Sequence, residues 1–266
     1  MSGTHARDGM NGRRGTVYLV GAGPGAPDLL TLRAAALLAR ADVVFHDALI
    51  PSETLALATR GQKIAVGKRC GRHSTAQRFI NKRLVDAATK YEVIVRLKGG
   101  DPMLFGRAQE EIAALEAAGV PYEVVPGITA ALAAAAQLRT SLTQRGRVRS
   151  FAFATPRAGE GEDVSHWIEG FRGVDAGAIY MGLRCAPAIA DALIGAGRAP
   201  ATPVAIVVDA SLPSARTYYT TLAGLPAFAQ RDIGRPALLL IGPQFHRRTA
   251  ISAVDATDWR ALAQSG

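Results

Sequence analysis

The sequence predicts an α/β protein with two parts, a parallel doubly wound sheet in the first half and a mixed-sheet α/β domain in the second. Short apolar runs alternate with helix-like stretches as far as residue 138, and several of these runs end in glycine or proline turns. In the second half, the strand-like runs 204–208 and 216–220 are joined by a short Ser/Pro loop. Because that loop is too short for a helical crossover, we expect the two runs to pair antiparallel.

The first half should contain five strands and four helices. The expected strands are 17–20, 43–45, 64–66, one beginning at Val93, and 122–125. The expected helices are 31–40 with Thr31 as N-cap, 74–89 with a capping box of Ser74 and Gln77, 108–118 ended by Gly119, and the nearly all-alanine 129–138.

The second half has a different pattern, with the domain boundary between Pro126 and Arg147. We expect a mobile arm at 1–15, domains at 16–128 and 129–247, and a tail at 248–266. The expected elements are strands 150–154, 177–181, 204–208, 216–220 and 237–241, and helices 186–194 and 222–229.

The composition is that of a globular protein, with 266 residues of which 48% are hydrophobic and 20% charged. No apolar run approaches the roughly 20 residues that cross a bilayer, and the polar start has no secretory core. Cys70 and Cys185 lie far apart, and the five histidines are scattered. We therefore expect a cytoplasmic protein with reduced thiols, no metal and no membrane association.

The net charge of +9 implies either an anionic partner or a solvated basic surface. Basic residues cluster over 60–72, 78–83 and 139–149, but aromatic residues make up only 6% and do not interleave with them. Nucleic-acid grooves usually combine charge with stacking platforms. A small substrate with many carboxylates fits as well, because arginine binds carboxylates in bidentate fashion.

The run 96–102, Arg-Leu-Lys-Gly-Gly-Asp-Pro, is the most informative turn in the chain. It follows the apolar run Val93-Ile94-Val95 and so reads as a strand that ends in bare backbone with one carboxylate. Ligands of open α/β sheets bind beyond the carboxyl ends of strands, where this turn falls. On its own, the turn is equally compatible with an ordinary strand-to-helix connection.

The run Gly21-Ala22-Gly23-Pro24-Gly25-Ala26 formally fits a dinucleotide fingerprint, with Asp47 near the expected place of a ribose-binding acid. Pro24 removes an N–H from the loop, and the late N-cap at Thr31 delays the helix that would face the phosphates. We therefore favour the interpretation that these glycines let a substrate or cofactor approach the sheet edge and bind no phosphate.

Three further residues have both an ordinary and a functional interpretation. Asp47 ends a strand, where a carboxylate is either a turn former or a general base. Lys68 is either a solvated lysine or a proton donor or anion anchor. Met181, next to Gly182, is either a core residue or part of a flat apolar pocket.

Taken together, these motifs resemble the tetrapyrrole methylases, and within them the uroporphyrinogen-III C-methyltransferase branch, from about Thr16 to Phe245. The resemblance implies the two-domain fold of that family, S-adenosylmethionine bound between the domains, and a homodimer. The matching blocks are 20–25, 47–50, 66–69, 71–74, 96–102, 105–107, 125–129 and 180–182.

The resemblance also implies roles for single residues. Asp47 matches the family's proton acceptor and Lys68 its proton donor. The cofactor-binding positions are Pro24, Gly99, Gly100, Asp101, Leu104, Thr129, Ala130, Met181, Ala210 and Ala237. An anionic tetrapyrrole substrate would account for the basic charge, and our candidates for binding its carboxylates are Arg69, Arg72, Arg107, Arg145 and Arg216.

Departures from the family pattern occur at His46, Gln144, Thr155–Arg157 and Ser211–Pro213, mostly in the second half. The expected reaction is the methylation of two ring carbons of uroporphyrinogen III, giving precorrin-2. The alternatives are a methylase of another tetrapyrrole or of a nucleic acid, a weakly active tetrapyrrole-binding paralogue, and a nicotinamide oxidoreductase.

Overall fold

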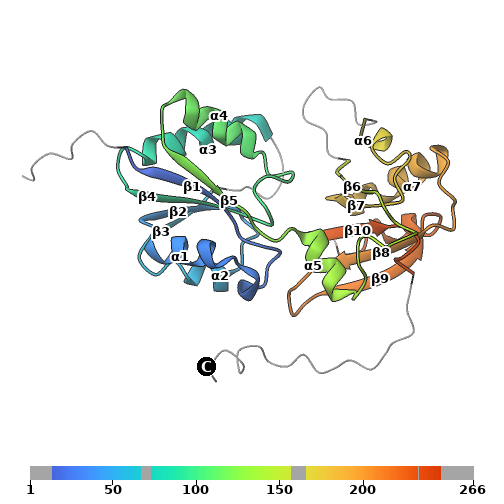
Figure 1. The fold of residues 1–266 in the computed structure, drawn as a ribbon. Helices are drawn as coiled ribbons and strands as arrows, with labels where there is room; N and C mark the ends of the chain where they lie inside the picture. The colour runs from blue at the N-terminus through green and yellow to red at the C-terminus, as the bar shows by residue number, and fades with distance from the viewer. Residues whose placement is uncertain (1–13, 67–72, 157–165, 233, 247–266) are drawn as a thin grey trace, which may run out of the picture.

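The computed structural model describes residues 14–66, 73–156, 166–232 and 234–246. It contains two five-stranded sheets, one from each half of the chain (Figure 1). The predicted tail, and the predicted arm except for Arg14 and Gly15, lie outside the described residues.

The first sheet is entirely parallel, as predicted, because all four strand pairs run in the same direction. Its order is β3-β2-β4-β1-β5, so the strand that ends in the glycine turn is central. The strands are β1 (Thr16–Gly21), β2 (Val43–His46), β3 (Gln62–Ala65), β4 (Val93–Lys98) and β5 (Tyr122–Val125).

Helices cover both faces of this sheet, which explains the continuous apolar runs of its strands. In Figure 1, α3 (His73–Ala87) and α4 (Ala108–Ala117) lie on one face, and α1 (Leu32–Arg40) and α2 (Ser52–Ala56) on the other. Leu19 packs toward α3 and α4, whereas its neighbour Val20 packs toward α1. The Thr31 hydroxyl accepts a hydrogen bond from Ala34 N at 3.1 Å, which confirms this residue as the N-cap of α1.

The second sheet is mixed, as predicted, with the order β6-β7-β10-β8-β9. β6 and β7 are parallel, and the other three pairs are antiparallel, including the expected pair of β8 and β9. The strands are β6 (Phe151–Ala154), β7 (Ala176–Tyr180), β8 (Pro203–Val208), β9 (Arg216–Thr221) and β10 (Ala237–Ile241).

The two faces of the second sheet are covered by different helices. Ala131 and Ala134 of α5 (Ala130–Gln137) pack with Leu240 on one face, while Ile189 of α7 (Ala186–Gly195) packs with Ile206 on the other. Figure 1 shows α5 on the side of the second sheet that is nearer the first. A short helix, α6 (His166–Glu169), completes this half.

One local prediction is wrong. Residues 222–229 form only a 3₁₀ turn, η3 (Leu225–Phe228), because Pro226 has no N–H to donate to the Leu222 carbonyl of a longer helix. The described part of α3 starts at His73, and the predicted capping box depends on the Ser74 side chain, which lies outside what the structure describes. The Gln77 amide donates to Asn81 and Glu111. Unpredicted elements are α2, α6, η1 (Pro27–Leu29) and η2 (Leu183–Cys185).

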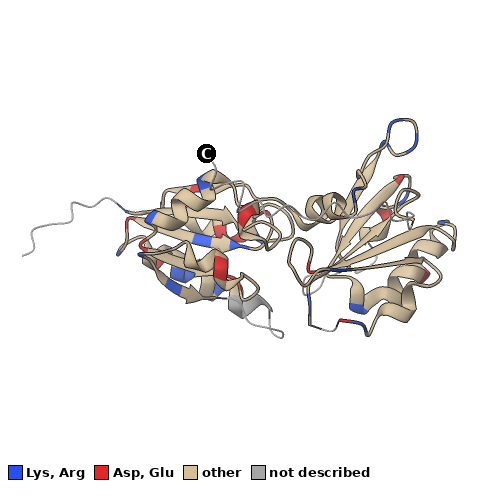
Figure 2. Ribbon diagram, turned by 90° about the horizontal axis from the view of Figure 1, so that it is seen from below, with Lys and Arg blue, Asp and Glu red and all other residues tan. Residues whose placement is uncertain are grey.

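None of the helices that the structure describes is long and apolar enough to cross a membrane. Basic and acidic segments are interspersed on the ribbons of both halves (Figure 2).

Candidate functional site

Three turns from neighbouring strands meet at the carboxyl edge of the first sheet, and they touch backbone to backbone. A Cβ atom on Gly127 would lie 2.3 Å from the Gly100 carbonyl oxygen, and one on Gly21 would lie 2.6 Å from Gly127 Cα. Gly100 N donates to Gly23 O at 2.7 Å, and Gly23 N donates back to Gly100 O at 3.2 Å. Side chains at Gly21 and Gly127 could not be accommodated at these distances, and the positive φ angles of Gly23 and Gly100, 70° and 66°, also favour glycine.

The same turns lack the features of a dinucleotide site. α1 begins only at Leu32, after the turn η1, so its N-terminus is delayed as expected. The N–H groups of Gly23 and Gly100 are engaged with each other's carbonyls. Pyrophosphate sites need free N–H groups at a helix N-terminus, so this geometry disfavours the nicotinamide alternative.

Asp101 holds the turn after β4 in place. One carboxylate oxygen accepts a hydrogen bond from Met103 N at 2.8 Å, and the other accepts one from Gly127 N at 2.9 Å. Asp101 therefore ties the turn after β4 to the turn after β5. Its predicted contact with a cofactor would have to coexist with these two bonds.

The structure places the predicted cofactor-binding residues along two facing edges. Met181 and Ala210 follow β7 and β8, and Ala237 begins β10, which runs antiparallel to both; all three therefore lie at one edge of the second sheet. Met181 is left-handed, with φ 56°, and is 42% exposed. The others lie in turns of the first half or at the start of α5: Pro24, Gly99, Gly100, Asp101, Leu104, Thr129 and Ala130.

Side-chain contacts join the two edges. The Tyr180 hydroxyl lies 2.7 Å from Thr129 Oγ1 and accepts a hydrogen bond from Ala131 N at 3.2 Å. The rings of Tyr180 and Phe105 lie 5.2 Å apart. Burial raises the pKa of Tyr180, so its hydroxyl stays protonated at neutral pH.

A second junction between the halves lies on the loop after β8. Ala26 N donates to Ser211 Oγ at 3.0 Å. Gly25 lies against the side chain of Leu212, because a Cβ atom there would come within 2.9 Å of it. The departure from the family pattern at Ser211–Pro213 therefore falls on residues that connect the halves.

Asp47 follows β2 and lies at the same edge as the glycine turn. Its Oδ2 accepts a long hydrogen bond of 3.4 Å from Gly99 N, and its Oδ1 lies 2.6 Å from Arg96 Nη2. The Asp47 side chain is 35% exposed, whereas that of Arg96 is 3% exposed. The carboxylate therefore has one face toward the edge and one toward the interior.

Behind Asp47 lies a network of buried charges that the sequence analysis missed. Glu111, fully buried on α4, accepts from Arg96 Nε at 2.9 Å and from Lys98 Nζ at 2.8 Å. Burial, followed by the Arg96 charge, lowers the pKa of Lys98. Burial also opposes the charge on Arg96, but the carboxylates of Asp47 and Glu111 outweigh it and raise the pKa of Arg96.

Sequence signals for this network do exist. Arg96 and Lys98 are two residues apart in a buried central strand, and therefore point to the same face. Glu111 occupies a core position of α4, in the series of Ala108, Ile112 and Leu115. A charged residue in a core series indicates a buried partner.

Of the predicted substrate-binding arginines, the structure describes Arg107, Arg145 and Arg216. Arg69 and Arg72, and the predicted proton donor Lys68, lie outside the described residues. Arg107 binds Glu110 through Nε and Nη2 at 2.6 and 2.7 Å, and Arg216 pairs with Asp232 at 2.8 Å. Arg145 is exposed in a turn of residues 144–148. Substrate carboxylates would have to compete with Glu110 and Asp232.

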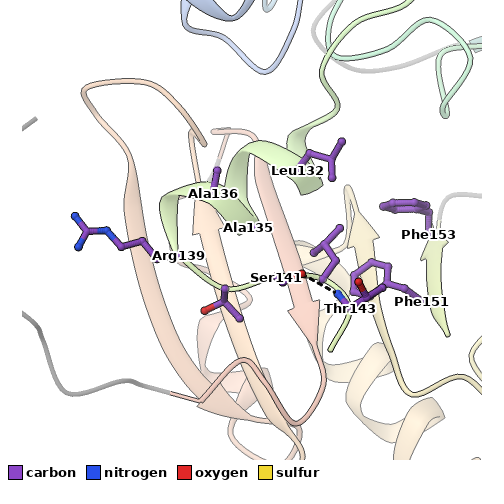
Figure 3. A pocket seen from close by; sticks show the side chains of 10 residues that line it. Leu132, Ala135, Ala136, Arg139, Ser141, Thr143, Phe151 and Phe153 are labelled. Carbon is purple, nitrogen blue, oxygen red and sulfur yellow. Dashed lines mark hydrogen bonds between the residues drawn. The ribbon is translucent and has the colours of Figure 1, made fainter. Parts of the chain in front are cut away.

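A hollow of about 580 Å³ lies between α5, the segment after it and β6 (Figure 3). Leu132 lies at one side, and Phe151 and Phe153 lie at another; the set also includes Arg139 and Thr143. None of the predicted site residues lines it. Phe153 connects it to the edge described above, because its ring lies 6.2 Å from that of Tyr180.

No group of three or more His, Cys, Asp or Glu side chains among the described residues is arranged to hold a metal ion. Cys185 is a free, exposed thiol, and Cys70 lies outside the described residues.

The parallel sheet, the mixed sheet and the glycine turns at their facing edges define a two-domain α/β protein with a candidate ligand site at the junction. The chain belongs to the tetrapyrrole (corrin/porphyrin) methylases, because the model of that family matches residues 16–226. The resemblance noted in the sequence is thereby confirmed at the level of the family.

Solved structures agree with this assignment. A uroporphyrin III C-methyl transferase from Thermus thermophilus is 39% identical and has a TM-score of 0.75, with 86% of this chain and 98% of that one covered. A second structure of that enzyme, complexed with S-adenyl homocysteine, is 38% identical with a TM-score of 0.73, and covers 86% and 92%. A cobalt precorrin-4 methyltransferase is 27% identical with a TM-score of 0.74, and covers 87% and 96%.

Curated relatives are longer. The siroheme synthase of Azotobacter vinelandii is 44% identical over 230 residues, which are 86% of this chain but 50% of that protein. The chain thus spans about half the length of the curated relatives it matches.

Proposed function

We propose that this chain transfers methyl groups from S-adenosylmethionine to two ring carbons of uroporphyrinogen III, giving precorrin-2 by way of precorrin-1. The observation that most supports the proposal is the position of Asp47, a half-buried carboxylate hydrogen-bonded to the glycine turn. The proposal is further supported by the family assignment and by the similarity to a uroporphyrin III C-methyl transferase over nearly all of that enzyme's length.

The residues fit the demands of the reaction. The sulfonium methyl group is already activated, so catalysis depends mainly on alignment of donor and acceptor, worth roughly 7–11 kcal/mol. The cofactor would lie between the glycine turns of the first sheet and the residues around Met181 and Ala210 in the second. After methylation the ring system must lose a proton, for which Asp47 is the proposed acceptor and Lys68 the proposed donor elsewhere in the cycle.

Two experiments test the proposal in turn. S-adenosylhomocysteine at about 100 times its dissociation constant should stabilise the protein by about 2.7 kcal/mol, whereas NAD should have no effect. Anaerobic incubation with uroporphyrinogen III and S-adenosylmethionine should release two equivalents of S-adenosylhomocysteine and give a dimethylated product. A folded protein that binds the nucleoside without turnover would exclude this substrate but not the family.

A second candidate substrate is another tetrapyrrole. The observation that favours it is the similarity to a cobalt precorrin-4 methyltransferase with a nearly equal TM-score, although at lower identity. Parallel incubations with later corrin intermediates would distinguish the two, because only the true substrate should give a low KM.

We also propose, from the resemblance, that the chain forms a homodimer in the cytoplasm and that its domains span 16–128 and 129–247. The packing of α5 alanines against β10 supports a second domain that begins near residue 129. Light scattering would test the dimer.

A further inference from the structure

Asp47 stands at the exposed end of a series of buried charged side chains. The chemistry proposed above gives no role to the buried members of this series. Arg96 contacts Asp47 Oδ1 at 2.6 Å and Glu111 Oε1 at 2.9 Å, so one guanidinium bridges two carboxylates. Lys98 contacts the other Glu111 oxygen at 2.8 Å, and the Gln77 amide donates to Oε1 at 3.3 Å. Among these charged groups only Asp47 is substantially exposed.

The series is not explained by stability alone. Buried ion pairs contribute little net stability, since apolar residues of the same volume often do as well or better. Glu111 stands in the core series of α4, where a leucine would pack against the sheet. The four formal charges cancel. The ion pairs run from Lys98 to Glu111, from Glu111 to Arg96 and from Arg96 to Asp47, the exposed end of the series.

We propose that Glu111 is a positioning residue for Asp47. It holds Arg96 from behind, Arg96 holds Oδ1 of Asp47, and Oδ2 is thereby left as the oxygen that accepts the proton. This inference rests on the proposed methyl transfer. Oδ2 is suited to the role because the hydrogen bond that it accepts from Gly99 N is long at 3.4 Å and therefore weak.

The reaction consists of methyl transfer followed by loss of a ring proton. The methyl–sulfur bond breaks with its electron pair going to sulfur, and a ring π-electron pair forms the new carbon–carbon bond. The ring system takes over the positive charge of the sulfonium. It becomes neutral when a ring proton passes to Asp47 Oδ2, and the protonated carboxyl group later releases that proton to solvent.

Lys98 connects the charged series to the loop after β4. Lys98 balances the second oxygen of Glu111, and its stem lies under Gly106, where an added Cβ atom would be 3.1 Å from Lys98 Cε. The network thus also touches the loop after β4 at Gly106. Groups held from several sides in this way keep a reacting atom in a productive geometry.

Glu111→Gln tests the inference, because it keeps the shape of the side chain and removes its charge. We expect kcat to fall by about 10- to 100-fold, within the range of coupling found for members of one network. The KM for the tetrapyrrole and the affinity for S-adenosylhomocysteine should change by less than about twofold, since neither ligand contacts Glu111 in this scheme. Glu116→Gln, an exposed glutamate on the same helix, is the matched control and should leave kcat unchanged.

A double-mutant cycle separates positioning from a merely structural role. If Glu111 acts through Asp47, Glu111→Gln should cause almost no further loss in an Asp47→Asn background. Losses that multiply would overturn the inference, as would a Glu111→Gln enzyme with normal kcat. Should Glu111→Gln fail to fold, Arg96→Lys serves in its place, because lysine keeps the charge but cannot bridge both carboxylates. A wild-type chain without methyl transfer would instead contradict the proposed function, and this inference with it.

Discussion

At the scale of single residues, Asp47 shows how a turn residue becomes a candidate base. Its backbone N–H donates to Leu97 O at 3.2 Å, which extends the pairing of β2 with β4 by one residue. The side chain is therefore delivered to the start of the glycine turn, where Arg96 and Gly99 hold its two oxygens. Its place is fixed by strand pairing rather than by a flexible loop.

Asp47→Asn should lower turnover by about 10²- to 10⁴-fold, because the amide cannot accept the proton. Cofactor affinity should stay nearly the same, since the backbone turn is retained. Single-turnover kinetics and calorimetry with S-adenosylhomocysteine would measure the two effects. Equal loss of both would remove Asp47 from the role of base.

Gly127→Ala should destabilise the fold by about 1–3 kcal/mol, because its Cβ atom would collide with the rigid Gly100 carbonyl. Gly195→Ala is the matched control: Gly195 is the last residue of α7, and no atom lies within 4 Å of an added Cβ. Urea unfolding should show the control close to wild type. Equal stability of both variants would contradict the close contact of the turns.

At the scale of elements, β4 combines two tasks. Ile94 packs toward α3 and α4, and Val95 and Leu97 pack toward α1. Arg96 and Lys98 share a face with Ile94 but turn toward Glu111 instead of a hydrophobic partner. One strand thus contributes to both cores and supports the edge of the site.

The pH dependence of stability should reveal the buried Lys98. Its pKa in the folded protein is lowered, chiefly by burial, from the usual 10.5, so between the lowered value and 10.5 the unfolded chain binds more protons. The free energy of unfolding contributed by Lys98 should therefore rise with pH in that window and be flat below it. Urea unfolding of wild type and Lys98→Met from pH 7 to 10 would measure it as a difference, with exposed Lys82→Met as control. A difference that falls with pH would contradict the assignment.

Periodicity and turn chemistry predicted approximately all ten strands that the described residues form, because the strands are short apolar runs bounded by glycine, proline or polar residues. The prediction of a helix at 222–229 was wrong because Pro226 prevents the longer helix that the apolar pattern indicates. The Gln77 amide bonds to Glu111, a partner 34 residues away that no local pattern indicates. The charge network needs the same kind of long-range contact between α4 and β4, which local pattern does not contain.

At the scale of the whole molecule, the two sheets are joined by a small number of specific contacts beside the site. Phe105 and Tyr180 form one junction, and Ala26 with Ser211 forms another. Ser211 itself is left-handed, with φ 73°, and its N–H donates to Gln137 on α5. Both junctions adjoin predicted cofactor positions, so ligand affinity and contact between the halves should be linked.

Ser211→Ala should weaken cofactor binding by about two- to tenfold, since one hydrogen bond contributes about 0.5–1.5 kcal/mol. Thr202→Ala is the control, because Thr202 precedes β8 at the opposite end from Ser211 and its hydroxyl donates only locally, to Ala199 O. Calorimetry with S-adenosylhomocysteine would compare the two. Unchanged affinity in Ser211→Ala would show that this junction does not affect the ligand.

The contact of Gly21, Gly100 and Gly127 has a consequence for protein engineering. A side chain on Gly21 or Gly127 would collide with the backbone of the neighbouring turns, so randomising either codon alone should return only glycine among functional clones. At Gly100 an added Cβ atom would meet no atom closer than 3.9 Å, and glycine is favoured there by the positive φ of 66° instead. New specificity would have to be sought around these positions, in Phe105, Leu132 and Phe153, whose side chains are exposed. The edge of the site thus combines glycine turns that cannot be changed singly with surrounding side chains that can.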